Sequence, residues 1–191
     1  MDMIKYILKS CGTLLVALAG LGSLSSIAQT RDRLDVPIEA PQFCLPDLDG
    51  NQIDIKDYRG DFVVIHIATT WCPFCNAEAP HLEELRQAYA DQNVRVLIID
   101  VKESRELVKE KLQDRFKFTF PVLLDMDGAV AASFAPADVL PDLARDEIML
   151  ASNLLIDPEG NIRFQSLLDS KNFDAKLLGL KKVLDELLSA Q

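Results

Sequence analysis

The junction between an apolar run and a pair of cysteines constrains the fold more than any other feature of the sequence. The run Phe62–Ala68 is apolar apart from one histidine, and Cys72-Pro73-Phe74-Cys75 follows it closely. A short apolar run of this kind predicts a strand that is buried on both faces. Pro73 suits the first position of a helix, because its missing N–H would have no partner there. We therefore predict a buried strand, a tight connection and a helix that begins at the cysteine pair.

The positions of the two cysteines predict different reactivities. Cys72 falls at the helix N-cap, where free backbone N–H groups and the positive end of the helix dipole favour a thiolate. We expect Cys72 to be the exposed nucleophile and Cys75, one turn further on, to be the buried resolving thiol. Attack by Cys72 on a substrate disulfide gives a mixed disulfide, which Cys75 then releases. The alternatives are a disulfide that only staples the fold and half of a zinc site, but the sequence has no second cysteine pair to complete the zinc site.

Length and composition indicate one folded domain. The chain has 191 residues, of which 49% are hydrophobic, and this is enough to build a full core. Its formal net charge is -10 at pH 7, and an acidic chain binds nucleic acid poorly, because phosphate binding requires clustered lysines and arginines. We therefore expect no nucleic-acid partner and interpret the acidity as a contribution to solubility.

The N-terminal residues 1–28 have the pattern of a signal peptide. Lys5 and Lys9 precede an apolar stretch, and Ser26-Ile27-Ala28 fits a cleavage site. The fully apolar part is shorter than the roughly 20 residues of a membrane span, so cleavage is favoured over an uncleaved membrane anchor. We expect a polar linker at 29–39 and the folded domain at 40–191. Export would place the protein in the periplasm or cell envelope, with no stable membrane insertion once the signal is cleaved.

The remaining pattern predicts an α/β domain with a partly parallel sheet, because strand-like and helical segments alternate. Asp49-Gly50-Asn51 indicates a hairpin turn near the start of the domain. Cys44 lies in a short strand-like stretch, where we expect a buried free thiol, a third redox-active thiol being the alternative. The other expected strands are 94–100, 120–124, 153–157 and 162–167, and the expected helices are 72–92, 104–117, 129–134 and 173–189.

Taken together, these landmarks resemble the exported thioredoxin-like thiol–disulfide oxidoreductases of the TlpA/ResA group, which are related to the AhpC/TSA redoxins. The resemblance implies a thioredoxin-like fold, with a mixed central sheet flanked by helices and an N-terminal β-hairpin extension. It implies the reduction of protein disulfides through Cys72 and Cys75, with no cofactor and no metal. The implied partners are disulfide-containing envelope or secreted proteins and an upstream membrane or periplasmic electron donor. The matching segments are 40–43, 47–50, 63–75, 78–80, 120–125 and 155–160.

Three further residues are candidates for supporting roles. The resemblance implies that Glu78 lines the substrate cavity and tunes the cysteines. His66 stands six residues before Cys72, where a buried imidazole could take the proton of Cys75 or could simply be a hydrogen-bonded core residue. Trp71 precedes the nucleophile, where it provides either a contact surface for substrates or only packing.

One position departs from the group's pattern. The group has a cis-proline before its Leu-Ile-Asp strand, facing the cysteine pair, and here Ala151 stands at that position after Leu150. A cis bond without proline costs ~2.5–4 kcal/mol, so this peptide is either trans or strained. We treat Leu150 and Ala151 as the substrate loop. The preceding segment, 135–150, is longer than the group usually has, and it is either a tolerated surface insertion or a wall of the docking groove.

Two other functions compete with disulfide reduction. A thiol peroxidase is suggested by Thr69, three residues before Cys72, although Ile65 stands where peroxiredoxins have a proline. The other competitor is a non-catalytic binding module with a thioredoxin scaffold, because a fold alone does not fix a function. A cysteine pair that never cycles would distinguish this module from an enzyme.

Overall fold

Strand β4 (Phe62–Ala68) is the centre of the sheet, and all seven of its residues are buried. In the computed structural model, which describes residues 33–136, 142, 152–167 and 173–191, β4 has a neighbour on each side. It pairs in parallel with β5 (Val94–Val101) and antiparallel with β7 (Ser152–Ile156). The continuous apolar sequence of β4 follows from this position, because a strand covered on both faces has no polar side.

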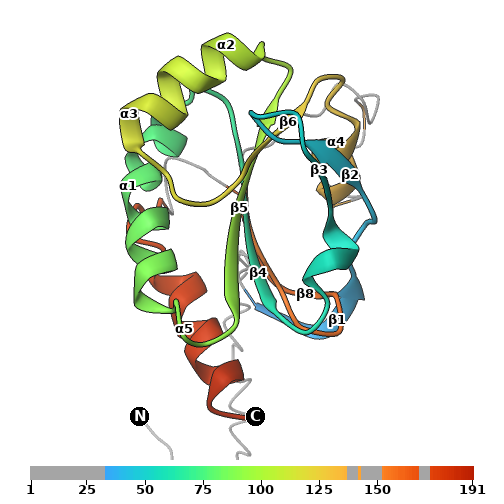
Figure 1. Cartoon of the computed structure of the whole chain (residues 1–191). Coiled ribbons are helices and arrows are strands. Elements are labelled where there is room, and N and C mark those ends of the chain that lie inside the picture. Colours follow the sequence, from blue (N-terminus) through green and yellow to red (C-terminus); the bar gives the residue numbers. More distant parts are fainter. Residues whose placement is uncertain (1–32, 137–141, 143–151, 168–172) are drawn as a thin grey trace, which may run out of the picture.

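Six strands form the main sheet, in the order β1-β8-β7-β4-β5-β6 (Figure 1). The half made of β4, β5 and β6 is parallel, and the other half is antiparallel. The mixed sheet confirms the predicted fold class. The remaining strands of this sheet are β6 (Val122–Asp125), β8 (Asn161–Leu167) and β1 (Arg33–Glu39).

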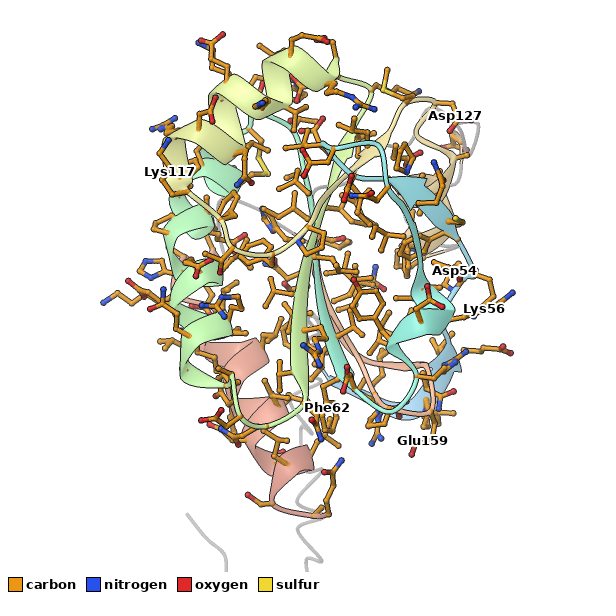
Figure 2. All side chains as sticks on the ribbon, viewed as in Figure 1. Asp54, Lys56, Phe62, Lys117, Asp127 and Glu159 are labelled. Carbon is orange, nitrogen blue, oxygen red and sulfur yellow. A yellow bond between two sulfur atoms is a disulfide. The ribbon has the colours of Figure 1, made fainter. Side chains whose placement is uncertain are left out.

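Two layers cover the sheet, and Figure 1 shows them on either side of it. Side chains of β4 alternate between them: Val64 and Ala68 pack in the core under α1, whereas Ile65 and Ile67 pack in the core under the hairpin. Side chains fill the space on both sides of the sheet, and labelled charged residues such as Lys117 and Glu159 lie at the periphery (Figure 2).

The first layer consists of α1 (Pro73–Ala88), α2 (Arg105–Val108), the π-helical turn η2 (Lys109–Gln113), α3 (Asp114–Phe116) and α5 (Leu178–Leu188). The second consists of the hairpin β2 (Cys44–Pro46) and β3 (Gln52–Asp54), the 3-10 helix η1 (Ile55–Tyr58) and α4 (Ala129–Phe134).

The expected polar linker at 29–39 differs from the structure, because Arg33–Glu39 forms the edge strand β1. The strand pairs with β8, so the free edge of β8 rather than an apolar pattern explains its formation. Val36 and Ile38 remain 74% and 54% exposed. Pro37 is tolerated because an edge strand has backbone groups that need no partner. The expected signal peptide, residues 1–28, lies outside the described residues.

Two further details differ from expectation. Cys44 is exposed rather than buried, because β2 alternates and it is Leu45 that points into the core. The C-terminal helix begins at Leu178 instead of Phe173, because Leu177 adopts a left-handed conformation with φ of 57°. The apolar spacing continues through this turn, and sequence periodicity does not reveal the break. No helix in the described part of the chain is long and apolar enough to cross a bilayer.

Helix α5 provides a matched test of the core. Leu184 is fully buried against the sheet and Leu178, in the same helix, is 63% exposed. Leu184→Ala is expected to lower the free energy of unfolding by about 2–5 kcal/mol, because it leaves a cavity. Leu178→Ala should change it by no more than about 0.5 kcal/mol. Urea unfolding of both variants checks this, and equal losses would contradict the packing of α5 described above.

Candidate active site

The two cysteines meet where β4 ends and α1 begins. Cys72 is the N-cap of α1, and its sulfur accepts a hydrogen bond from the backbone N–H of Cys75 at 3.2 Å. Pro73 follows as the first helical residue, which confirms the predicted helix start. The two sulfur atoms are joined in a disulfide. Cys72 is only 7% exposed, whereas we expected an exposed nucleophile, and Cys75 is more buried at 1%.

A set of hydrogen bonds fixes the connection that leads to Cys72. The carboxylate of Glu103, which follows β5, accepts from the backbone N–H of Thr70 at 2.5 Å and from its hydroxyl at 2.7 Å. The side-chain amide of Asn76 donates to the carbonyl oxygens of Thr70 and Cys72, both at 2.8 Å. Arg115 in turn donates to the Asn76 side-chain oxygen at 3.2 Å. The backbone just before the nucleophile is therefore held by side chains from two separate segments, and Arg115 of a third segment supports Asn76.

A buried carboxyl group lies on the β5 side of this connection. Asp100 is 1% exposed and stands in register between Ala68 of β4 and Leu124 of β6. Neither of its carboxyl oxygens has a hydrogen-bond partner among the described residues. Burial raises the pKa of Asp100 to about 8, and the nearby Glu103 carboxylate adds to this rise. Asp100 is therefore mainly protonated at neutral pH, because the charged form would lie in the core without a partner.

On the β7 side of β4, three buried polar side chains contact one another. His66 of β4 stands directly opposite Asn153 of β7, and its Nδ1 lies 2.7 Å from the Asn153 side-chain oxygen. The Asn153 amide nitrogen donates to both Glu78 carboxyl oxygens, at 3.0 and 3.1 Å. Glu78 lies one turn beyond Cys75 on α1, so its side chain and that of Cys75 share a helix face. Asn153 thus joins the strand histidine to the helix carboxyl.

The environments of His66 and Glu78 favour their neutral forms. Burial lowers the pKa of His66 to about 4, and the hydrogen bond to Asn153 opposes this shift. Burial raises the pKa of Glu78 to about 7; the Asn153 hydrogen bond opposes this rise and the negative charge of Asp174 adds to it. The 3.5 Å contact between His66 Nδ1 and Glu78 Oε2 is therefore not an ion pair at neutral pH.

Three aromatic side chains lie near the cysteine pair. Trp71, immediately before Cys72, is 70% exposed and does not belong to the core. Phe74, between the cysteines, contacts Phe173 with ring centroids 4.8 Å apart. Phe173 lies outside α5, in the segment that leads to it, and thereby brings that segment beside the start of α1.

The structure brings Cys72, Cys75, Glu78 and His66 together at one end of β4, with Trp71 at the surface beside them. Leu150 and Ala151, the expected substrate loop, lie outside the described residues. Sequence reasoning did not single out Asn153 or Glu103. A polar residue inside the apolar strand β7 is a signal for Asn153, but its pairing with His66 depends on strand register. No group of three or more possible metal ligands occurs in the described ranges.

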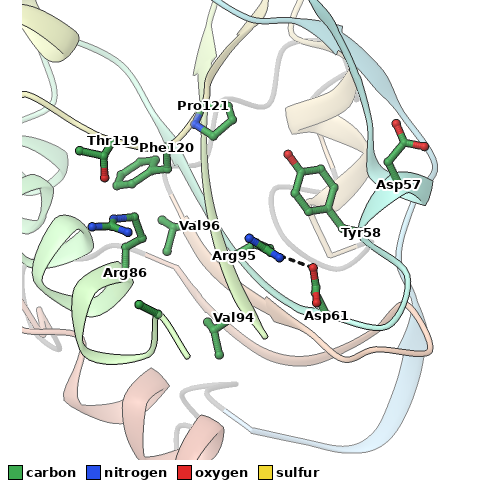
Figure 3. A pocket seen from close by; sticks show the side chains of 11 residues that line it. Asp57, Tyr58, Asp61, Arg86, Val94, Arg95, Val96, Thr119, Phe120 and Pro121 are labelled. Carbon is green, nitrogen blue, oxygen red and sulfur yellow. Dashed lines mark hydrogen bonds and ion pairs between the residues drawn. The ribbon is translucent and has the colours of Figure 1, made fainter. Parts of the chain in front are cut away.

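Figure 3 shows a hollow lined by residues around the start of β5. This cavity of about 340 Å³ lies beside the start of β5, whereas the cysteines follow the end of β4. Its two arginines already have partners, since Arg95 pairs with Asp61 at 2.8 Å and Arg86 with Glu83 at 2.9 Å. The lining also includes Tyr58 and Phe120, and no cysteine is among the residues described around it.

The proteins that this chain resembles agree with a redox site at the cysteine pair. The model of the AhpC/TSA family matches residues 36–165, which include the cysteine pair and Asn153. This chain belongs to the AhpC/TSA family. The thiol-disulfide oxidoreductase ResA of Geobacillus kaustophilus is 33% identical over 152 residues, covering 78% of this chain and 80% of that protein. ResA of Bacillus subtilis is 29% identical over 153 residues, covering 79% of each. These relatives confirm the resemblance to the TlpA/ResA group.

Two solved structures confirm the fold. The thioredoxin domain of a thiol-disulfide oxidoreductase from Bacteroides vulgatus superposes with a TM-score of 0.62 at 20% identity, covering 81% of this chain and 99% of that one. A putative protein disulfide isomerase from Bacteroides thetaiotaomicron gives 0.61 at 25% identity, covering 83% and 94%. The predicted thioredoxin-like architecture is therefore correct for this AhpC/TSA family member.

Asp100 should make the stability of the protein depend on pH. The pKa of Asp100 rises from its ordinary 3.8 to about 8 in the folded protein, so between these values the folded state keeps a proton that the unfolded state has lost. Stability therefore falls as pH rises through this window. Asp100→Asn should remove that fall. The free energy of unfolding of the variant, relative to that of the wild type, should therefore increase from pH 4 to pH 8.

Urea unfolding at several pH values measures this difference. Asp91→Asn, at an exposed acid, is the matched control and should follow the wild type. An advantage of Asp100→Asn that stays constant with pH would show that Asp100 is ionised in the fold.

Proposed function

We propose that this thiol–disulfide oxidoreductase reduces disulfides in exported proteins, using Cys72 as nucleophile and Cys75 as resolving thiol. The observation that carries the proposal is the Cys72–Cys75 pair at the start of α1, with a buried carboxyl one turn beyond it. As a thiol–disulfide oxidoreductase, the protein acts on disulfide-containing proteins. That these are envelope or secreted proteins, and that an upstream donor in the membrane or periplasm recharges the pair, belongs to the proposal.

The proposed cycle starts from the dithiol form. The Cys72 thiolate attacks one sulfur of a substrate disulfide; a bond forms between Cys72 and that sulfur, and the second substrate sulfur leaves as a thiolate that takes up a proton. Cys75 then loses its proton and attacks Cys72. The Cys72–Cys75 bond forms, the mixed disulfide breaks, and the substrate sulfur that was bonded to Cys72 leaves and is protonated. Two electrons have passed from the cysteine pair to the substrate.

The N-cap position supports Cys72 as the nucleophile. Its sulfur accepts the N–H of Cys75, and a thiolate accepts such a bond more strongly than a thiol does. Trp71, 70% exposed beside it, offers an apolar surface for the substrate chain near the scissile disulfide. The hydrogen bonds from Glu103 and Asn76 to the preceding connection keep Cys72 at the helix start while its sulfur changes partners.

We assign the proton of Cys75 to Glu78 rather than to His66. The pKa of Glu78 is raised to about 7, which suits a group that must accept a proton and release it near neutral pH. The pKa of His66 is lowered to about 4, which makes its ring a weak base. Glu78 and Cys75 are neighbours on one helix face, whereas His66 reaches Glu78 through Asn153.

A redox titration of the purified protein in thiol–disulfide buffers tests the function, with the state of the cysteines read by alkylation and mass. A reversible two-electron transition near −270 mV supports a reductase, whereas a value near −120 mV points to an oxidase, since related pairs span roughly this range. A pair that never cycles would leave a non-catalytic binding module as the better reading.

Single cysteine variants should separate the two roles. Cys75→Ser is expected to accumulate a mixed disulfide with a model disulfide substrate, because the resolving step is lost. Cys72→Ser should form none. Cys44→Ser is the matched control, since Cys44 is exposed on the hairpin, and it should keep the full cycle. Mass spectrometry of the quenched reaction detects each adduct, and trapping by Cys72→Ser would reverse the assignment.

The resolving step should depend on pH through Glu78. Its pKa of about 7 predicts that the rate of mixed-disulfide release rises as pH passes through 7, because the carboxylate must be free to accept the proton. Glu78→Gln should remove this rise and lower the rate at pH 8 at least about tenfold. Glu84→Gln changes an exposed acid on the same helix and should leave the profile unchanged. Single-turnover kinetics that retain the rise in Glu78→Gln would exclude this role.

A further inference from the structure

Asn153 lies between two titratable side chains in the core. It is 2% exposed, and His66 and Glu78 are each 1% exposed. Its oxygen lies 2.7 Å from His66 Nδ1, and its nitrogen lies 3.0 and 3.1 Å from the two Glu78 oxygens. The register of β7 against β4 sets this arrangement, because His66 and Asn153 are direct cross-strand partners.

This orientation of the amide decides which nitrogen of His66 carries a hydrogen. The Asn153 nitrogen donates to a carboxyl group, so the Asn153 oxygen faces the ring and can only accept. His66 Nδ1 must then be the N–H donor. In a neutral imidazole the other nitrogen, Nε2, is left with a bare lone pair. Nε2 is buried and has no hydrogen-bond partner among the described residues of the disulfide form.

We propose that Asn153 is a positioning residue that locks His66 as the neutral Nδ1–H tautomer, so that Nε2 accepts the Cys75 thiol hydrogen in the reduced protein. This proposal rests on the proposed redox cycle. Reduction of the disulfide adds two electrons and two protons, and one proton creates the S–H group of Cys75. The same core therefore has an unfilled acceptor in the disulfide form and a filled one in the dithiol form.

The packing of β4 against α1 supports this partner. The side chain of His66 lies on the same face of β4 as Val64 and Ala68, because side chains alternate along a strand. Val64, Ala68 and Cys75 belong to one core cluster, and Cys75 is 1% exposed. The reverse orientation of the amide would leave Nε2–H as a buried donor without a partner, which is the less favourable arrangement.

The lock has a consequence for the redox equilibrium. A hydrogen bond made only by the dithiol stabilises that form relative to the disulfide, so the pair becomes less reducing than it would be without the bond. His66 stays neutral throughout, acting as a hydrogen-bond acceptor and not as the base of the resolving step.

Nitrogen-15 NMR of the histidine rings tests the tautomer directly. The chain has two histidines, and His81→Gln identifies the signals of His66. We expect a protonated Nδ1 and an unprotonated Nε2 in the disulfide form, with a change confined to Nε2 on reduction. A protonated Nε2, or an Nε2 signal that ignores reduction, would overturn the proposal.

Asn153→Thr and Asn153→Val form a matched pair for the same test. The two side chains have nearly the same shape and suit a strand, but only the threonine hydroxyl can accept from His66 and donate to Glu78. The equilibrium constant for disulfide formation against glutathione should rise about threefold to tenfold in Asn153→Val. In Asn153→Thr it should stay within about twofold of the wild type. Equal equilibrium constants in the two variants would contradict the proposal that Asn153 fixes the tautomer of His66.

Two controls distinguish the role of His66 from that of Glu78 and from the proposed redox function. In the first, Asn153→Thr and Asn153→Val are compared again in the Glu78→Gln background. If their equilibrium constants for disulfide formation still differ, Asn153 acts through His66. If the difference disappears, it acts through the Glu78 carboxyl group. The tautomer measurement on the disulfide form does not require the cysteines to cycle. If the redox titration fails while Nδ1–H is found, the proposed function falls and the lock on His66 stands; if the pair cycles with Nε2–H, the lock alone is wrong.

Discussion

The pairing of β4 with one parallel and one antiparallel neighbour is the constraint on which the site depends. The parallel partner, β5, places Asp100 beside Ala68 and lets the following Glu103 reach the backbone of Thr70. The antiparallel partner, β7, places Asn153 opposite His66. A shift of β7 by one residue would bring an apolar leucine or the short Ser152 side chain to that position. Two ladders of backbone hydrogen bonds therefore set the chemistry around the cysteines.

The sequence was sufficient to predict the fold class and the start of the active-site helix. Phe62–Ala68 has a continuous apolar pattern and Pro73 has a strong positional preference, and both are local signals. Strand β1 could not be predicted in this way, because its formation depends on the free edge of β8. The start of α5 was missed for a similar reason, since the apolar spacing of Phe173 and Leu177 continues across a turn in which the backbone is not helical.

The candidate site also combines residues that local spacing predicts with residues that only the tertiary structure brings in. Cys75 is three residues from both Cys72 and Glu78 at the start of one helix, so the spacing alone places it beside each of them. Asn153 reaches the site from β7 and Glu103 from the segment after β5, and no spacing along the chain indicates which residue will lie opposite His66. Strand register and the packing of β5 decide these contacts. The buried acids Asp100 and Glu78 lie on β5 and α1, and burial raises the pKa of both.

The exposed indole beside the nucleophile has an optical consequence. Trp71 is the one tryptophan in the sequence, so all indole emission of the protein comes from the residue next to Cys72. Disulfides quench indole fluorescence at short range, whereas thiols do so less. We therefore expect the fluorescence intensity of the unlabelled protein to follow the state of its own cysteine pair, and a partner that covers the 70% exposed ring to shift the emission wavelength.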